Sequence, residues 1–222
     1  MAELYHLGVP TAAVPRLALL VDPQLGLAPV VAAVSGRQLA SRREYVSHLG
    51  GWDGHDILVT TVGVGAPPLA IAVEELSRAG TEAMVLLGAA TLTGVSSRWL
   101  LPHGAVRRDG TSAQYAPLPF PAIPDPRLRA ALAAASGEAA TYGIVETVDV
   151  LEDETSGHPT SCQELRCAAL FVVAAVRHVR AGALLTDRAA AVDGGGAGDG
   201  TVHDMAVAAC RALTALTASS ST

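Results

Sequence analysis

The sequence predicts an α/β fold in which a mostly parallel sheet is covered by helices. Short apolar runs typical of buried strands alternate along the chain with longer segments of helical periodicity. Such alternation is typical of βαβ units, whose crossover helices cover the faces of the sheet. The chain has 222 residues, 50% of them hydrophobic, which is enough to bury a sizeable core. We therefore expect one domain over residues 1–222, with a disordered tail at 217–222.

The first half of the chain shows two strands and a helix. Residues 16–21, RLALLV, form a short apolar run that ends at an Asp-Pro turn, as a buried strand does. Residues 57–64 form a second run, which leads into a turn rich in glycine and proline at 63–68. Helical periodicity then continues to Gly80, so we expect a strand, a glycine turn and a helix in succession.

The second half continues this alternation up to a terminal helix. We expect strands at 83–88, 143–150 and 182–186, and helices at 125–136, 164–179 and 203–216. Pro126 in the first turn and Gly137 just beyond the end support the helix at 125–136. The glycine-rich segment 194–200 has no large apolar side chain to anchor it, so we expect a mobile loop, either simply flexible or acting as a lid.

Charge and hydropathy argue against two classes of partner. The formal net charge is −6, and no cluster of Lys and Arg with interleaved aromatic residues is present, so nucleic-acid binding is not expected. No apolar run reaches membrane-spanning length, and the N-terminus lacks a basic stretch followed by an apolar one. We expect a cytoplasmic protein that does not bind membranes.

The three cysteines, Cys162, Cys167 and Cys210, are expected to be buried free thiols. Their number is odd, and Cys162 and Cys167 lack the spacing and the companion ligands of a zinc site. A nucleophilic cysteine needs a nearby base, and the sequence shows none. We expect no metal site.

Five sequence blocks stand out along the chain. They are ASRREY at 40–45, TTVGVGAPPLAIAVEELSRAG at 60–80, PHGAVRRDGTSAQYAPLPFPAIP at 102–124, ELRCAALF at 164–171 and RAGALLT at 180–186. In this order they resemble uridine phosphorylases of the nucleoside phosphorylase family. The resemblance extends over almost the whole chain, from Tyr5-His6-Leu7-Gly8 to the terminal helix.

The resemblance implies a fold, an activity and an assembly. The fold is a three-layer arrangement in which a mixed central sheet forms a distorted barrel flanked by helices. Members of the family cleave the N-glycosidic bond of a nucleoside with phosphate, and nucleosidase relatives use water on the same scaffold. They assemble as dimers that often join into hexamers, with two subunits completing each site, and their ligands are small molecules. No redox cofactor is implied, and we expect none.

Positions at which the family holds phosphate carry other residues in this chain. The family's Gly-Asp-Pro turn becomes Val21-Asp22-Pro23, and the arginine that follows it is absent. A second phosphate arginine becomes Leu86, and the phosphate-binding threonine becomes Ala89, with Thr91 slightly downstream as a substitute hydroxyl. The loss of two arginines removes roughly 3–6 kcal/mol of phosphate binding, at about 1.5–3 kcal/mol for each charge-assisted hydrogen bond. Efficient phosphorolysis of uridine is not expected.

Two residues that the family lends across the subunit interface are retained. Arg43 matches an arginine, and His6 matches a ribose-contacting histidine, each contributed by the neighbouring subunit. Taken alone, Arg43 is a solvated interface charge and His6 a surface residue on a flexible terminus. Their flanking patterns favour ligand contact for both.

Arg166 reverses the chemistry of the ribose position. The family's Glu-Met-Glu segment becomes Glu164-Leu165-Arg166, and its second glutamate holds the ribose hydroxyls. A guanidinium only donates hydrogen bonds, whereas a carboxylate accepts them. Arg166 either forms a structural ion pair with Glu164, Glu146 or Asp149, or joins Arg43 and His6 in binding a carboxylate or phosphate of the ligand.

Two carboxyl groups are candidates for assisting the leaving group. Asp187 approximates the position of an aspartate that protonates the leaving base in purine-specific relatives, and the competing interpretation is an Asp187-Arg188 turn. Glu164 is the second candidate. The Gln and Arg that recognise uracil in the family are missing, and the acidic segment 145–154 occupies the region, as a solvated run or as a grip for a cationic ligand.

Three hypotheses for function follow. The first is a divergent enzyme of this family that acts on an N-glycoside or nucleoside-like small molecule, with water as the favoured nucleophile. The second is a repurposed scaffold that binds or transforms a carboxylated, non-nucleoside small molecule of specialised metabolism. The third is a non-catalytic ligand sensor.

Overall fold

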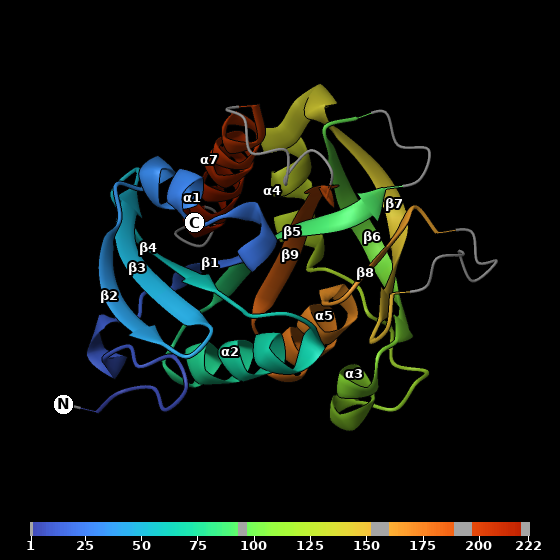
Figure 1. The fold of residues 1–222 in the computed structure, drawn as a ribbon, viewed down its shortest axis with the longest axis horizontal. Helices are drawn as coiled ribbons and strands as arrows, with labels where there is room; N and C mark the ends of the chain where they lie inside the picture. The colour runs from blue at the N-terminus through green and yellow to red at the C-terminus, as the bar shows by residue number, and fades with distance from the viewer. Residues whose placement is uncertain (1, 93–96, 152–159, 189–196, 219–222) are drawn as a thin grey trace.

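The computed structural model describes residues 2–92, 97–151, 160–188 and 197–218, and its described strands form one mixed sheet (Figure 1). The strands are β1 (Leu17–Val21), β2 (Arg37–Arg42), β3 (Tyr45–Trp52), β4 (His55–Thr61), β5 (Ala83–Leu92), β6 (Trp99–Arg108), β7 (Ala140–Val148), β8 (Cys162–Glu164) and β9 (Arg180–Asp187). Their order is β2-β3-β4-β1-β5-β8-β7-β6-β9, and β9 also pairs with β5. The last five strands therefore close into a barrel, which confirms the distorted barrel that the resemblance implies.

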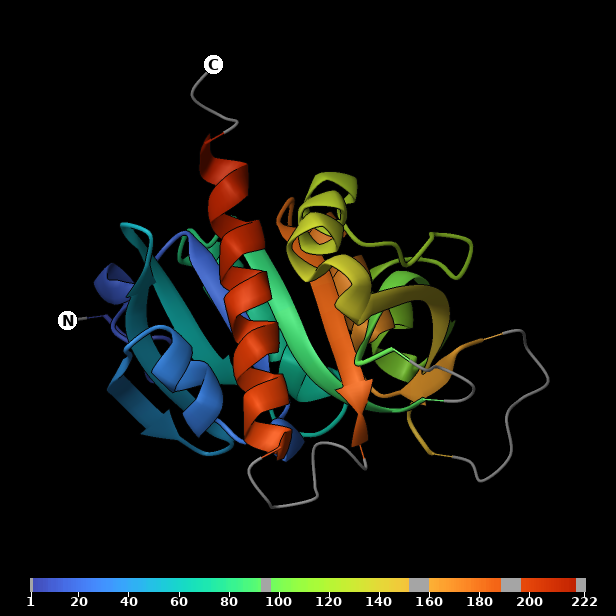
Figure 2. The ribbon, with the colours of Figure 1, turned by 90° about the horizontal axis from the view of Figure 1, so that it is seen from above.

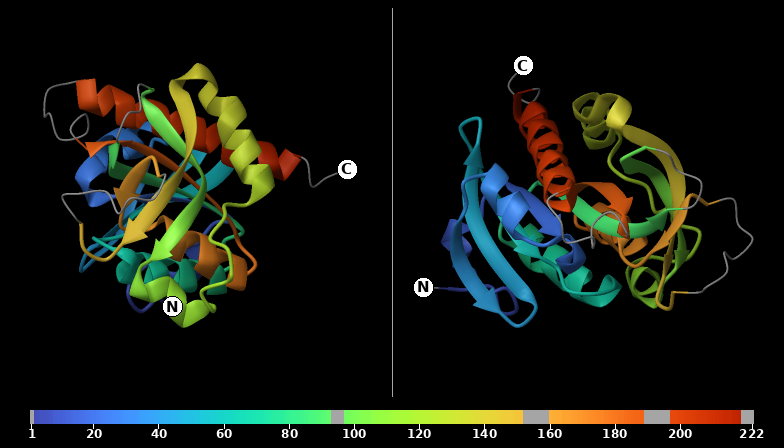
Figure 3. Two further views of the ribbon diagram at one scale, coloured as in Figure 1. Left: turned by 90° about the vertical axis from the view of Figure 1, so that its right-hand side faces the viewer. Right: turned by 45° about the horizontal axis from the view of Figure 1, so that its top comes forward.

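The parallel part of the sheet brings four strand ends to one edge. β1 pairs in parallel with β4 and β5, and β5 pairs in parallel with β9. The register places Val21 opposite Thr61 and Leu87, and Ala90 opposite Asp187. The carboxyl ends of β4, β1, β5 and β9 consequently meet at the same edge. β2 and β3 extend the sheet as an antiparallel hairpin on the far side of β4, opposite the barrel end formed by β6 and β7 (Figure 3).

Helices cover both faces of the sheet. They are α1 (Ala28–Ala33), α2 (Ala66–Arg78), α3 (Gly110–Tyr115), α4 (Pro126–Ser136), α5 (Cys167–Val176) and α7 (Ala197–Ala218), with short 3-10 turns at η1 (Thr11–Ala13), η2 (Pro23–Leu25) and η3 (Gly137–Ala139). α2, α3 and α5 lie on one face, and α1, α4 and α7 lie on the other (Figures 1 and 2). Two apolar cores result, one on each face, and the core beside α5 extends into the barrel through Leu100, Val145 and Leu185.

Local signals explain where the predicted helices begin and end. α4 begins after Asp125, whose side chain accepts a hydrogen bond from the backbone N–H of Leu128 at 2.8 Å, and it ends at Gly137. α2 begins after Gly65, with φ of 89°, and the chain turns away after it at Gly80, with φ of 102°. The strands expected at 16–21, 57–64, 83–88, 143–150 and 182–186 are confirmed as β1, β4, β5, β7 and β9, with shifted ends.

The main differences from the expected helices concern α5 and α7. α5 begins at Cys167 and not at 164, because Glu164 belongs to β8 and its side chain caps the helix. α7 begins at Ala197, so the second half of the glycine-rich segment is helical and is not a loop, whereas 194–196 lie outside the described residues. α7 also continues through Thr217 and Ala218, two residues into the predicted tail, of which 219–222 lie outside the described residues. Among the helices described, none is long and apolar enough to cross a membrane.

Candidate active site at the carboxyl edge of the parallel strands

The edge where β4, β1, β5 and β9 end carries most of the predicted site residues. Gly63 follows β4, Asp22 follows β1, Thr91 lies near the end of β5, and Asp187 ends β9. Ligands of open α/β sheets bind at the carboxyl ends of the strands, because the loops there leave crevices above the sheet. The connection from β8 to α5 enters the same edge and brings Arg166 with it.

Arg166 forms a buried, bidentate ion pair with Asp22. The Nη1 atom of Arg166 lies 2.8 Å from Oδ2 of Asp22, and Nη2 lies 3.2 Å from Oδ1. Only 3% of the Arg166 side chain and 1% of the Asp22 side chain are exposed. Nη2 also donates to the carbonyl oxygen of Gly63 at 2.9 Å. The structure thus corrects the expected partners Glu164, Glu146 and Asp149: the carboxylate that faces the guanidinium is that of Asp22.

The Asp22 carboxylate receives two backbone hydrogen bonds in addition to those from Arg166. Its Oδ1 accepts from the N–H of Gln24 at 3.0 Å, and its Oδ2 accepts from the N–H of Ala89 at 3.2 Å. Ala89 occupies the position at which the resemblance places a phosphate-binding threonine. The Nε atom of Arg166 is buried without a hydrogen-bond partner among the described residues.

Glu164 is fully engaged at the N-terminus of α5. Its carboxylate accepts hydrogen bonds from the backbone N–H of Arg166 at 2.6 Å and of Cys167 at 2.9 Å, and from the hydroxyl of Thr147. Burial raises the pKa of Glu164 above its ordinary value, although these hydrogen bonds oppose the shift. The Thr147 hydroxyl in turn accepts from the N–H of Ala168 at 2.8 Å. Glu164 therefore caps a helix and fixes the backbone of the residue that pairs with Asp22.

Asp187 and Thr91 lie at the same edge on the ends of neighbouring strands. Asp187 is half-buried, and its Oδ2 accepts from the N–H of Leu92 at 3.2 Å, which ties the end of β9 to the end of β5. Thr91 is exposed and lies opposite Gln163 in the pairing of β5 with β8. The described contacts join neither residue to the Asp22–Arg166 pair.

His6 and Arg43 are brought together on the outer surface, apart from that pair. Arg43 sits at the tip of the β2–β3 hairpin with φ of 55°, and its Cζ lies 5.7 Å from the ring centroid of Tyr5. The Tyr5 ring makes an edge contact with His6 at 4.8 Å between centroids. Nδ1 of His6 lies 2.8 Å from Oε1 of Glu75 on α2, which holds the ring in place.

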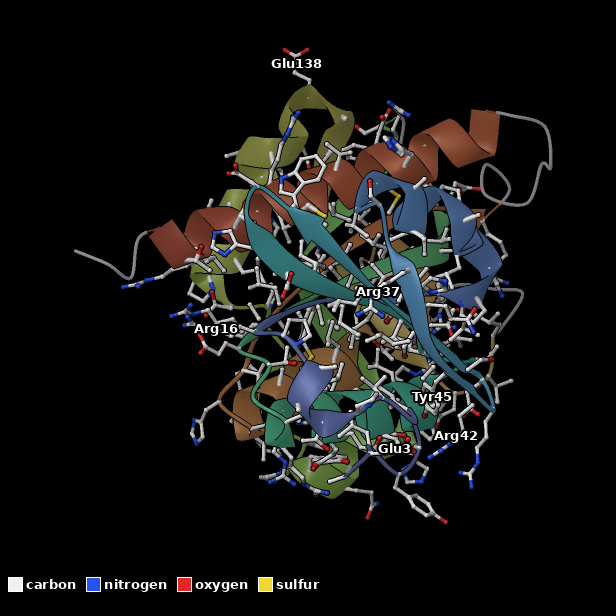
Figure 4. The ribbon with its side chains drawn as sticks, turned by 90° about the vertical axis from the view of Figure 1, so that its left-hand side faces the viewer. Glu3, Arg16, Arg37, Arg42, Tyr45 and Glu138 are labelled. Atoms are coloured by element: carbon white, nitrogen blue, oxygen red, sulfur yellow. The ribbon has the colours of Figure 1, made fainter. Side chains whose placement is uncertain are left out.

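The N-terminal segment is fastened to the same hairpin. Arg42 donates to the carbonyl oxygen of Tyr5 at 3.1 Å and pairs with Glu3 at 3.0 Å, and Figure 4 shows Arg42, Glu3 and Tyr45 together on this side of the molecule. The Tyr45 hydroxyl donates to the carbonyl oxygen of Pro68 at 2.9 Å. The hairpin is thereby attached to the glycine turn at 63–68, whose Gly63 carbonyl oxygen accepts the hydrogen bond from Arg166.

An open cavity of about 530 Å³ lies between the turn before α2 and the start of α3. It is lined by residues 64–67 of that turn, by the start of α3, and by Asp149 and Leu165. Leu165 precedes Arg166 in the chain, but neither Asp22 nor Arg166 is among the described residues that line the cavity. Oδ2 of Asp149 accepts from the N–H of Gly110 at 2.8 Å and closes one side of the cavity.

The acidic segment is not a uniformly solvated run. Glu146 is fully buried and accepts hydrogen bonds from Arg108 at 3.2 Å and from Gln163 at 3.1 Å. Asp149 is exposed, and residues 152–154 lie outside the described residues. The expectation of a solvated run is therefore wrong for Glu146.

Burial explains the state of the cysteines. Cys162, Cys167 and Cys210 are free and buried, as expected. Burial raises the pKa of the Cys210 thiol to about 12, and it also raises the pKa of Cys162 and of Cys167 above the ordinary value. Among the described residues, no group of three or more His, Cys, Asp or Glu side chains is arranged to hold a metal ion.

Comparison with known proteins identifies the family. No model of a known protein family matches the chain. The uridine phosphorylase of Treponema pallidum is 33% identical over 174 residues, which are 67% of this chain and 67% of that protein. This chain belongs to the nucleoside phosphorylase family. The guanosine phosphorylase of Halorubrum lacusprofundi is 29% identical over 161 residues, again 67% of each chain.

Further relatives and solved structures agree with this membership. The uridine phosphorylase of Thermococcus kodakarensis is 34% identical over 134 residues, which are 58% of this chain but only 48% of that protein. The crystal structure of the uridine phosphorylase of Vibrio fischeri superposes with a TM-score of 0.83 at 20% identity, over 97% of this chain and 98% of that one. The purine nucleoside phosphorylase of Toxoplasma gondii, in complex with immucillin-H, gives a TM-score of 0.84 at 20% identity with the same coverage. These two likenesses establish that the nucleoside phosphorylase fold extends over nearly the whole chain.

The sequence does not predict the contacts that three residues of this chain, Asp22, Thr147 and Glu75, make with the candidate site residues. Asp22 was visible as part of the Asp-Pro turn, but its partner lies 144 positions away, and local spacing carries no sign of such a pair. Thr147 and Glu75, which hold Glu164 and His6, occur within a strand and a helix and resemble ordinary polar positions there.

Proposed function

We propose that this chain cleaves the N-glycosidic bond of a nucleoside or nucleoside-like small molecule without using inorganic phosphate. Water is the proposed nucleophile. The observation that carries the proposal is the buried Asp22–Arg166 ion pair. The resemblance assigns the turn at Asp22 to phosphate and the position of Arg166 to the ribose hydroxyls. The ion pair joins these two positions.

The pair neutralises the cation at the position that the resemblance assigns to the ribose. Arg166 is neutralised by Asp22, and the backbone N–H of Ala89 is already bonded to the same carboxylate. Leu86 stands where the family has an arginine, and it is buried in the core with 1% exposure. A phosphate dianion would need several cationic or amide donors to replace its hydration. These donors are occupied or replaced, which supports a phosphate-independent reaction.

We assign the proton that the leaving group requires to Asp187. Its carboxyl group is half-buried at the end of β9, at the edge that carries Thr91 and the Asp22–Arg166 pair. Cleavage of an N-glycoside develops negative charge on the leaving base, and a carboxylic acid placed there neutralises that charge. Glu164 is proposed to act indirectly, by capping α5 and holding Arg166.

His6 and Arg43 are proposed to complete the site of a second copy of the chain. Both lie on the outer surface around Tyr5, and the contacts described join neither to Asp22. Arg43 is exposed, and no carboxylate among the described residues forms a hydrogen bond or ion pair with it. A homodimer, or a hexamer of such dimers, would bring the two halves together.

Base release from a nucleoside panel tests the proposal. The purified chain is incubated with pyrimidine and purine nucleosides, with and without phosphate, and free base and sugar product are quantified. The expected result is release at equal rates in both conditions, with free sugar and no sugar phosphate as product. Asp187→Asn should lower kcat roughly 10²–10⁴-fold, as expected for removal of a general acid. No release from any nucleoside in either condition would exclude the proposal.

One observation favours a second candidate, the binding of a carboxylated, non-nucleoside molecule. The exposed Arg43 guanidinium rests on the Tyr5 ring beside His6, and such a cation is suited to a ligand carboxylate. In that case a panel of small carboxylic acids should raise the Tm of the wild-type chain, whereas Arg43→Ala should abolish the shift. A panel without any stabilising acid would remove this candidate.

A further inference from the structure

We propose that N–H donors around Asp22 form an anion-binding site, called the cradle below, and that the Asp22 carboxylate fills it as a tethered anion. Truncation of the Asp22 side chain should therefore open a site for a free carboxylate of the size of formate. The inference deepens the proposed function, on which it rests, because it identifies the anion that pairs with Arg166 in the place of a bound ligand.

The first step is the convergence of donors on a single carboxylate. Four N–H groups point at it: the backbone N–H groups of Gln24 and Ala89, and Nη1 and Nη2 of Arg166. Backbone amides combined with a bidentate guanidinium are donors that proteins use for bound carboxylates and phosphates. The Asp22 side chain occupies the place of such an ion.

The second step is that each donor is held independently of the Asp22 side chain. Ala89 lies within β5, where it is paired with Thr186 of β9. Gln24 lies in η2, which is closed by the hydrogen bond from the N–H of Gly26 to the carbonyl oxygen of Pro23. The backbone N–H of Arg166 is bonded to Glu164, and its Nη2 is bonded to Gly63. The cradle should therefore keep its shape when the carboxylate is removed.

The third step is that removal of the Asp22 carboxylate leaves the buried charge of Arg166 without a counterion. Arg166 is 97% buried, and a buried guanidinium that loses its carboxylate is strongly destabilised unless another anion replaces it. Nε of Arg166 is also buried and unbonded among the described residues, so the guanidinium has no second hydrogen-bonded carboxylate there to replace Asp22. The volume vacated by Asp22→Ala is that of a carboxylate, which makes formate the matched probe.

The test is a thermal-shift titration of variants of the full chain. Asp22→Ala is titrated with sodium formate and, at equal ionic strength, with sodium chloride. The expected Tm increase in formate over chloride is about 3–6 °C at a concentration tenfold above the Kd. The wild type should show no such difference, and Asp22→Ala combined with Arg166→Met should lose it.

A matched control comes from a second Asp-Pro cap in the chain. Asp125 precedes Pro126 and caps α4 through the N–H of Leu128, and no arginine side chain of the described residues is bonded to its carboxylate. Asp125→Ala should respond equally to formate and chloride. If Asp22→Ala folds only in formate, that rescue supports the inference, and Asp22→Ser provides a second variant whose hydroxyl can still accept the Gln24 N–H.

The outcomes separate the inference from the proposed function. No formate-specific stabilisation of either Asp22 variant, or the same stabilisation of Asp125→Ala, would overturn the tethered anion. Phosphate-dependent cleavage of a nucleoside by the wild type would overturn the proposed function instead. The thermal-shift titration does not depend on catalytic activity, and the cleavage assay uses only the wild-type chain.

Discussion

At the scale of single residues, the contact between Asp22 and Arg166 is the observation on which the proposed function rests. Both side chains are almost fully buried, and their charges cancel. A buried ion pair contributes little net stability, yet the removal of one partner is costly because it strands the other charge. Our proposal therefore gives the pair a role in function, the exclusion of an external anion, and not a role in stability.

A double-mutant cycle measures this coupling. Arg166→Met leaves the Asp22 carboxylate buried with only two backbone donors, so the free energy of unfolding should fall by about 3–5 kcal/mol. Asp22→Asn combined with Arg166→Met should recover a large part of that loss, since neither charge is then left alone. Urea unfolding of the two single variants and the double variant checks the prediction. Strictly additive losses would show that the two side chains do not interact.

The raised pKa of Glu164 predicts that the stability of the chain depends on pH. Burial raises its folded-state pKa above the ordinary value of 4.5, so the folded chain binds this proton more tightly than the unfolded chain. Between pH 4.5 and the raised folded pKa, this group makes the free energy of unfolding decrease as pH rises. Glu164→Gln cannot titrate, and the wild type should therefore lose stability relative to it across that window. Urea unfolding of both proteins at several pH values tests this, and a constant difference would contradict it.

At the scale of elements, the close approach of the β2–β3 hairpin to the turn before α2 shapes the mouth of the site. Gly63 has φ of 65°, and a Cβ at this position would lie 2.9 Å from Cγ of Glu44 and 3.1 Å from Pro68. Glycine is needed there for its backbone conformation and for the space it leaves. The same residue supplies the carbonyl oxygen that accepts from Arg166.

A pair of glycine variants separates these two requirements. Gly54 also has positive φ, of 77°, but a Cβ there would meet nothing within 4 Å. Gly54→Ala should cost about 1–2 kcal/mol of unfolding free energy through backbone strain alone. Gly63→Ala should cost about 1–3 kcal/mol more, because the Glu44 side chain and Pro68 must give way to the new methyl group. Equal losses in thermal or urea unfolding would mean that the hairpin accommodates the methyl group without strain.

The elements were predictable from the sequence to the extent that their signals are local. The apolar runs at 16–21 and 83–88 predict β1 and β5, and Asp125, Pro126 and Gly137 mark both ends of α4. The start of α5 was misplaced because Glu164 has a helix-compatible neighbourhood, although it ends a strand of three residues whose pairing is not local. The partner of Arg166 could not be found in the same way, since the fold alone brings Asp22 to it.

At the scale of the whole molecule, we predict a shared site, because the described contacts do not join Arg43 to the candidate residues at the sheet edge. Asp187 lies at the sheet edge, whereas Arg43 lies on the hairpin tip. If a second copy supplies Arg43, Arg43→Ala and Asp187→Asn should each be inactive alone. Mixed after subunit exchange, they should regain about a quarter of the wild-type sites, because half of the dimers are mixed and each of these has one intact site. A mixture as inactive as its components would place both residues in one subunit's site.

Base release by the wild-type chain under strictly phosphate-free conditions, compared with release at saturating phosphate, is the decisive measurement. A site closed by its own Asp22 carboxylate should release base at the same rate in both, and the sugar product should be free. Cleavage of uridine that requires phosphate and yields a sugar phosphate would show that an external anion reaches the edge that the Asp22–Arg166 pair is proposed to close.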